Sequence, residues 1–162
     1  MKKRGKKKFN LFLLIICFFV TYFTAFIGST FTMRNTDSPW YLEIKPTITP
    51  PNWVFPIVWN ILFFLISISL YLLITNAKTK YYKKMVLVTF GINLFLNALW
   101  SYLYFGIKNP SAALIEIIPL EISAFAMIIV AWKVNKTAAW LLIPYSLWLG
   151  FAIILNYLTV FS

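Results

Sequence analysis

Histidine is absent from this 162-residue chain, and cysteine occurs only once, as Cys17. The lack of histidine removes the usual ligand of zinc and haem iron, and the usual side chain for acid–base catalysis near neutral pH. A single cysteine excludes an intramolecular disulfide. We therefore expect no metal site and no required cofactor, and we keep an enzyme only as an alternative.

Charged residues are also scarce. They make up 12% of the chain, whereas soluble domains carry about 25%, and only four residues are Asp or Glu. Hydrophobic residues account for 61% and aromatic residues for 20%. Four stretches without any charge are each long enough to cross a membrane as a helix of roughly 20 residues. These stretches are 9–33, 46–77, 85–107 and 137–162.

A fifth apolar stretch, 109–132, is interrupted only by Glu116 and Glu121. Five spans use nearly the whole chain, so the sequence predicts an all-α integral membrane protein, a bundle of five transmembrane helices. Residues 1–8 form a basic segment before a single domain, 9–162. The first apolar stretch is too long for the core of a typical signal peptide, so we expect a retained helix. The expected helices are 9–32, 52–75, 85–105, 110–132 and 137–161.

The basic residues gather on one side of the predicted bundle. Six of the fifteen lie in residues 2–8, four in 78–84 and two in 133–136, and the other side holds three. The positive-inside rule then places the N-terminus in the cytoplasm and the C-terminus outside, as in the cytoplasmic membrane of a prokaryote. This basic side suits anionic membrane lipid, and its position argues against nucleic acid as a partner.

Tryptophan and proline are abundant just after the first predicted helix. The segment 38–60, SPWYLEIKPTITPPNWVFPIVWN, contains three Trp and five Pro. Each proline fixes its own φ and restricts the residue before it, so this connection is stiff. Tryptophan in such a place lies at a membrane interface or lines a pocket. We expect the segment to form a lid over the mouth of the bundle.

Polar side chains inside a bilayer need partners, so they point to a site. The third helix carries Asn93, Asn97 and Ser101 at intervals of four residues, with Trp100 on a neighbouring row. Such residues either bond to neighbouring helices or face a ligand. For Asn97 both interpretations stay open.

The fifth helix presents a stripe of aromatic and polar residues that consists of Tyr145, Trp148, Ala152 and Asn156. Large rings beside a small alanine can form a flat slot, although ordinary helix packing explains the stripe as well. Trp59 would extend the aromatic lining from the second helix. The tryptophans at the predicted helix ends are interpreted as interface anchors, namely Trp53, Trp132 and Trp140.

Glu116 and Glu121 are five positions apart, about 140° around a helix, so they face different directions unless Pro119 shifts the register. Neither has an obvious basic partner at its depth. Each is either a neutral acid bonded to a neighbouring helix or a contact for a ligand or proton. The second interpretation keeps a transporter or channel subunit open as a function.

The chain resembles the tryptophan-rich sensory protein, or translocator protein, family, also called the peripheral-type benzodiazepine receptor family. The resemblance covers about residues 38–157. It rests on Trp40-Tyr41, Lys45-Pro46, Pro50-Pro51, Trp53-Val54-Phe55, Val58-Trp59, LNALWS at 96–101, Ala113 to Glu116, and LLIPYSLWLGFAIILNY at 141–157.

This resemblance implies a five-helix bundle, commonly a homodimer, with a pocket closed by the lid. It implies a receptor, sensor or carrier for a flat hydrophobic ligand, foremost a porphyrin such as protoporphyrin IX. The alternative is light- and oxygen-dependent degradation of porphyrin, with Trp40 and Trp148 as candidate catalytic residues. Matched positions and the patterns above give the expected ligand-binding residues as Trp40, Pro51, Trp59, Asn97, Trp100, Glu116, Tyr145, Trp148, Ala152 and Asn156.

Two positions depart from the family's pattern. Ile48 stands where a second lid tryptophan is usual, so the lid lacks one ring that would contact a porphyrin. Tyr157 is not followed by a basic residue, so the sterol-associated motif is incomplete and a sterol ligand is disfavoured.

Overall fold

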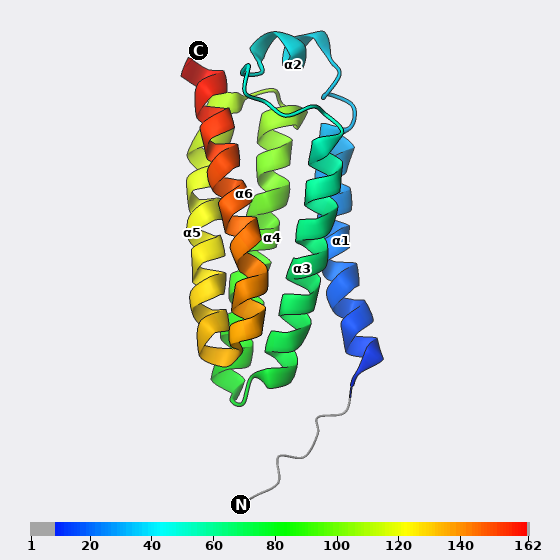
Figure 1. Cartoon of the computed structure of the whole chain (residues 1–162), viewed down its shortest axis with the longest axis vertical. Coiled ribbons are helices and arrows are strands. Elements are labelled where there is room, and N and C mark those ends of the chain that lie inside the picture. Colours follow the sequence, from blue (N-terminus) through cyan, green and yellow to red (C-terminus); the bar gives the residue numbers. More distant parts are fainter. Residues whose placement is uncertain (1–8, 162) are drawn as a thin grey trace, which may run out of the picture.

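The computed structural model describes residues 9–161, and over that range the chain contains helices and no strand (Figure 1). Five helices are long and apolar enough to cross a membrane. They are α1 (Leu11–Thr32), α3 (Val54–Asn76), α4 (Lys80–Ser101) with its continuation η1 (Tyr102–Gly106), α5 (Pro110–Val134) and α6 (Lys136–Phe161). The expected all-α membrane fold with five spans is confirmed. The predicted basic segment 1–8 lies outside the described residues.

The five long helices form a closed ring whose order differs from their order in the chain. Going around the ring, α1 packs on α3, α3 on α6, α6 on α5, α5 on α4, and α4 on α1. The connections α3–α4 and α5–α6 lie at one end, called the turn end. The short helix α2 (Pro39–Ile44) covers the opposite end, called the lid end (Figure 1).

Side-chain caps fix where the helices begin. Helix α4 begins at Lys80, five residues before the expected start at 85, because the Thr79 hydroxyl accepts a hydrogen bond from the backbone N–H of Tyr82. The expected helix began where the charge-free stretch begins, but α4 begins earlier and includes the charged residues before that stretch. Lys83 and Lys84 therefore lie in a helix rather than in a loop.

The lid, expected as a loop, contains a short helix. Ser38 caps α2, and Pro39 occupies its first turn, where its missing N–H leaves no bond unmade. Tyr41 is the buried residue of this helix and packs in one apolar cluster with Tyr104 and Phe105. The lid is thereby docked on the end of α4.

Helix α4 ends in a wider turn. In η1 the backbone N–H of Ile107 donates to the carbonyl of Tyr102, 2.9 Å away, and Lys108 then takes a positive φ of 53°. A π-helical turn shifts the side chains that follow it around the helix axis. Tyr104 and Phe105 are buried beneath α2 in this arrangement.

Candidate ligand-binding cavity

A cavity of about 450 Å³ opens at the lid end of the bundle, under the connection between α1 and α3. Its lining residues come from α1, the connection, α3, α4 with η1, and α6. Among the described residues, α5 contributes none. The cavity volume lies within the roughly 300–1,000 Å³ that is usual for small-molecule sites.

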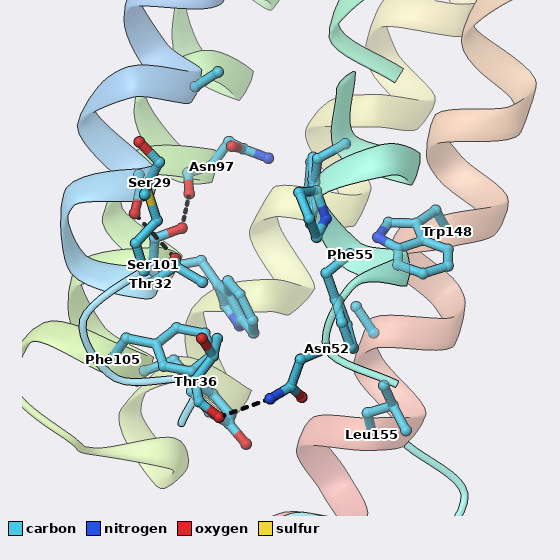
Figure 2. A pocket seen from close by; sticks show the side chains of 18 of the residues that line it. Ser29, Thr32, Thr36, Asn52, Phe55, Asn97, Ser101, Phe105, Trp148 and Leu155 are labelled. Carbon is cyan, nitrogen blue, oxygen red and sulfur yellow. Dashed lines mark hydrogen bonds between the residues drawn. The ribbon is translucent and has the colours of Figure 1, made fainter. Parts of the chain in front are cut away.

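The cavity has two chemically different walls, which Figure 2 shows facing each other. On one side α1 and α4 present Ser29, Thr32 and Ser101, beside Asn97. Hydroxyl and amide groups here can bond to a polar group of a ligand. On the other side α3 and α6 present Phe55, Trp148 and Leu155, an apolar surface.

Three indole rings lie around this cavity, one from each of three helices: Trp59 from α3, Trp100 from α4 and Trp148 from α6. The Nε1 of Trp100 donates to Oδ1 of Asn156 over 3.1 Å, which fixes the plane of that indole. Trp148 lies edge-on to Phe55 with 5.9 Å between ring centroids. Trp59 lies edge-on to the buried ring of Tyr145 at 6.3 Å.

A hydrogen-bond chain lies beneath the cavity. Nδ2 of Asn97 donates to the Tyr145 hydroxyl at 3.3 Å, and that hydroxyl donates to Oδ1 of Asn93 at 3.0 Å. Nδ2 of Asn93 in turn donates to Ser123 Oγ at 2.8 Å, which joins α4, α5 and α6. Because Asn97 both enters this chain and lines the cavity, its two interpretations are compatible. Asn93 serves the helix contacts.

Comparison with known proteins places the chain in a family. Residues 14–161 match the sequence profile of the TspO/MBR family. The chain belongs to this family. The resemblance stated from the sequence is thereby confirmed, and with the five apolar helices it shows an integral membrane protein.

The TspO/MBR relatives come from all three domains of life. The chain is 39% identical over 149 residues to the tryptophan-rich protein TspO of Archaeoglobus fulgidus, covering 91% of this chain and 95% of the relative. It is 36% identical over 146 residues to the protein of the same name from Chlorobaculum tepidum, with 89% and 91% covered. It is 31% identical over 137 residues to the translocator protein of Homo sapiens, with 82% and 79% covered.

Of the ten expected ligand-binding residues, six line the cavity of this family member. They are Trp59, Asn97, Trp100, Trp148, Ala152 and Asn156. The other four, Trp40, Pro51, Glu116 and Tyr145, are not among the lining residues. Tyr145 is fully buried behind Trp59, and Pro51 is exposed. Ligand binding by any of the ten stays a prediction.

Trp40, a candidate catalytic residue, lies on the lid rather than on the cavity wall. Its ring packs edge-on to Tyr104, with 6.1 Å between centroids. The ammonium group of Lys108 lies 5.7 Å from the centre of the same indole, a cation–π contact between the α4–α5 turn and the lid. The structure thus gives Trp40 a role in docking the lid.

The two acidic residues of α5 have different surroundings. Oε1 of Glu121 accepts a hydrogen bond of 2.6 Å from Ser146 Oγ on α6, as the structural interpretation of this residue predicts. Glu116 is buried, and neither of its carboxyl oxygens has a hydrogen-bond partner among the described residues. Of the two interpretations left open for Glu116, the hydrogen bond to a neighbouring helix is not formed among the described residues, and the contact with a ligand or proton stays a prediction.

Sequence reasoning missed the contribution of α1, which reads as a uniformly apolar helix. Its cavity-lining residues include small and hydroxyl residues as well as the aromatic Tyr22 and Phe26. Thr21, Ala25, Gly28 and Thr32 recur at intervals of three or four residues, which defines one face of a helix. The last three of these line the cavity.

The two ends of the lid are tied to each other. Nδ2 of Asn52 donates to the carbonyl of Thr36 at 3.0 Å and to Oδ1 of Asp37 at 2.8 Å (Figure 2 marks the first bond).

Two further lid residues differ in their exposure. Burial, with a smaller contribution from the neighbouring Tyr104, raises the pKa of Tyr41 to about 12. Ile48, the position without the usual tryptophan, is exposed and not among the lining residues.

Proposed function

We propose that this membrane protein is a receptor, sensor or carrier that binds a flat hydrophobic ligand, foremost a porphyrin, in the cavity beneath the lid. The observation that carries the proposal is the set of three indoles around one cavity: Trp59, Trp100 and Trp148. Aromatic faces stack favourably on a planar conjugated ring. The opposite wall, with Ser29 and Ser101, offers hydroxyl groups to a polar edge of the ligand.

The arrangement favours binding without chemical conversion. The two candidate catalytic indoles occupy different places, because Trp148 lines the cavity and Trp40 packs on Tyr104 in the lid. Degradation of porphyrin would need both to act on one bound pigment. We therefore keep light-dependent degradation as an outcome of the test.

The test is a titration of purified protein in detergent with protoporphyrin IX in the dark, followed by absorption and fluorescence. Trp148→Leu removes one aromatic contact, for which stacking contributes about 0.5–1.5 kcal/mol, so we expect Kd to rise roughly 2- to 10-fold. Trp140→Leu is the matched control, because Trp140 is on the same helix, 60% exposed and absent from the cavity.

Saturable binding that weakens in Trp148→Leu and is unchanged in Trp140→Leu would support the proposal. Equal affinity in both variants would overturn it. Illumination of the loaded protein then separates the alternatives, because binding leaves the mass of the pigment unchanged. Loss of pigment in light that requires both Trp40 and Trp148 would establish degradation.

We further propose the cytoplasmic membrane of a prokaryote, with the turn end inside. Six of the eight lysines of the described chain support this orientation, since they lie at or next to the turn-end connections, and Lys45 and Lys108 lie at the lid end; the six are Lys78, Lys80, Lys83, Lys84, Lys133 and Lys136. Single cysteines introduced at Lys80 and at Thr47 of the lid, in a Cys17→Ala background, would be labelled from opposite sides by a membrane-impermeant maleimide. Labelling of the lid from the cytoplasm would contradict this.

A homodimer is proposed as the assembled state. It is supported by Gly91 on α4, where a side chain would meet nothing within 4 Å and a second helix can approach closely. Light scattering of the protein in detergent tests the proposal. A Gly91→Leu variant is expected to shift the protein toward the monomer, and an unshifted dimer would place the interface elsewhere.

A further inference from the structure

A second, smaller depression lies on the outer surface between α3 and α6. It is lined only by apolar residues, which are Val58, Ile61, Leu62, Pro144, Leu147 and Trp148. Ile61 is 55% exposed and Leu147 71% exposed, so this groove faces outward from the bundle. On a membrane-spanning surface an outward apolar groove meets lipid chains.

Trp148 is common to the groove and the inner cavity. Its indole therefore separates the space inside the bundle from the outer surface at the seam between α3 and α6. The groove and the cavity wall next to it are both apolar, and in that wall Trp148 packs edge-on against Phe55. Trp148 is therefore the side chain that a molecule in the groove and a molecule in the cavity would both contact.

Hydrogen bonds divide the bundle into two groups of helices. Thr21 of α1 is hydrogen-bonded to Ser67 of α3, and the Tyr22 hydroxyl donates to the Asn60 carbonyl at 3.2 Å. Helices α4, α5 and α6 are joined to one another along their length. Their bonds include Asn93–Ser123, Asn97–Tyr145, Trp100–Asn156, Tyr104–Thr159 and Glu121–Ser146.

The seam between α3 and α6 carries a single side-chain hydrogen bond between described residues. Ser69 Oγ donates to the carbonyl of Ala138 at 2.9 Å, close to the turn end. Toward the lid end no side-chain hydrogen bond between residues 9–161 crosses this seam, where rings such as Phe55 and Trp148 meet, and the two helices diverge there in the view of Figure 1. Separating apolar surfaces into lipid exposes no unpaired polar group, so the two helices can part toward the lid end without breaking a side-chain hydrogen bond between described residues.

Proline at position 144 adds a pivot. Pro144 lies within α6, in the groove, and cannot donate the backbone bond that an internal helix residue normally makes. Helices bend preferentially at such residues. A bend here moves the lid-end half of α6, which includes Trp148, relative to α3.

We infer that the α3–α6 groove is an outer binding site for an apolar ligand dissolved in the bilayer, and that the ligand enters the cavity there by displacing the Trp148 indole. This inference rests on the proposed function, because it assigns the route by which the ligand of that cavity arrives. The lid then closes the cavity toward the aqueous side and need not open for each binding event.

The test blocks the groove without touching the cavity. Leu147→Cys, in a Cys17→Ala background, is labelled with a bulky maleimide, and the rates of protoporphyrin IX association and dissociation are measured in lipid nanodiscs. Ile154→Cys is the matched control, since it lies two turns along the same face of α6, is 52% exposed and belongs to neither the groove nor the cavity.

We expect the label at 147 to slow association and dissociation by the same factor, at least about tenfold, while Kd stays unchanged, because blocking a path alters rates and not the end states. The label at 154 should leave both rates unchanged. Unaltered rates with the label at 147 would overturn the entrance. A loss of affinity with an unchanged association rate would overturn it too, because the label would then act on the bound state and not on entry.

A second measurement does not depend on porphyrin. Lipids brominated on their acyl chains quench a tryptophan that they touch, and the Trp148 contribution is the difference between the wild type and Trp148→Phe. We expect this contribution to be quenched in the free protein and protected by the label at 147. An unquenched Trp148 would overturn the inference even if the cavity binds porphyrin. Absence of porphyrin binding with a quenched Trp148 would instead count against the proposed function alone.

Discussion

Trp100 and Asn156 join α4 to α6 at the cavity wall through one hydrogen bond of 3.1 Å from the indole Nε1 to the amide Oδ1. The other end of the amide is also used, since Nδ2 of Asn156 donates to the carbonyl of Pro110 at 2.9 Å. One buried side chain thus holds an indole of the cavity and ties the start of α5 to α6. The wall depends on this amide for its shape.

Replacing Asn156 by Leu should destabilise the protein by about 1–3 kcal/mol, because the Trp100 N–H and the Pro110 carbonyl lose a buried partner. Thermal unfolding in detergent measures the effect. In the double variant Trp100→Phe/Asn156→Leu the unpaired indole donor is gone, so we expect a smaller loss than the sum of the two single variants. Strict additivity would show that the bond contributes nothing.

Glu116 and Glu121 provide a matched pair on one helix. Glu116→Met removes a buried carboxyl group that has no partner, so we expect a higher unfolding temperature. Glu121→Met instead removes the acceptor of Ser146, so we expect a lower one. Neither change should alter ligand affinity, because α5 does not line the cavity. A loss of affinity or transport in Glu116→Gln would restore the ligand or proton role considered from the sequence.

The docking of the lid should depend on alkaline pH through Tyr41. Its pKa is about 12 in the folded protein and about 10 in an exposed phenol, so the docked form favours the protonated ring. This stabilisation is complete below pH 10 and is lost as the pH rises toward 12, by up to about 1.4 kcal/mol per pH unit. The unfolding temperature should therefore fall more between pH 9 and 11 in the wild type than in Tyr41→Phe. Parallel curves would contradict the burial of this phenol.

Gly106 of η1 and Gly150 of α6 should respond in opposite ways to alanine. A Cβ at Gly106 would lie 2.8 Å from Cδ2 of Tyr102 and 3.1 Å from Cδ1 of Phe31, so both rings must move, and overpacking costs about 1–3 kcal/mol. At Gly150 it would meet nothing within 4 Å, and alanine there should stabilise the helix by about 0.5–1 kcal/mol. Thermal unfolding of the two variants makes the comparison, and a stabilised Gly106→Ala would contradict the packing at η1.

The spans could be predicted because a bilayer imposes a simple rule on sequence. A long stretch with few or no charges can cross as a helix, so four charge-free stretches and a fifth interrupted only by Glu116 and Glu121 marked the five long helices. The rule does not predict where each helix begins, because a capping residue determines the first residue of the helix. Thr79 extended α4 to Lys80, and Ser38 created α2 inside a segment that looked like a stiff loop.

The cavity could be predicted in part. Aromatic and amide residues on predicted helices led to Trp59, Asn97, Trp100 and Trp148, all of which line it. The face of α1 was missed, because glycine and hydroxyl residues among many apolar ones carry a weak signal. Glu116, which was expected from a matching position, is not among the lining residues, and its contact with a ligand stays a prediction.

The sequence by itself determined the class of the protein, the number of its spans and its family, because composition and ordered motifs are properties of the chain. Tertiary structure decided which of the candidate residues share a space. The ring order α1, α3, α6, α5, α4 brings α3 beside α6 and leaves α5 away from the cavity, and no periodicity in one helix encodes its neighbours. The same packing places Trp148 between the cavity and the outer groove, and it places Trp40 against Tyr104 in the lid. Both positions depend on contacts between segments that are distant in the sequence.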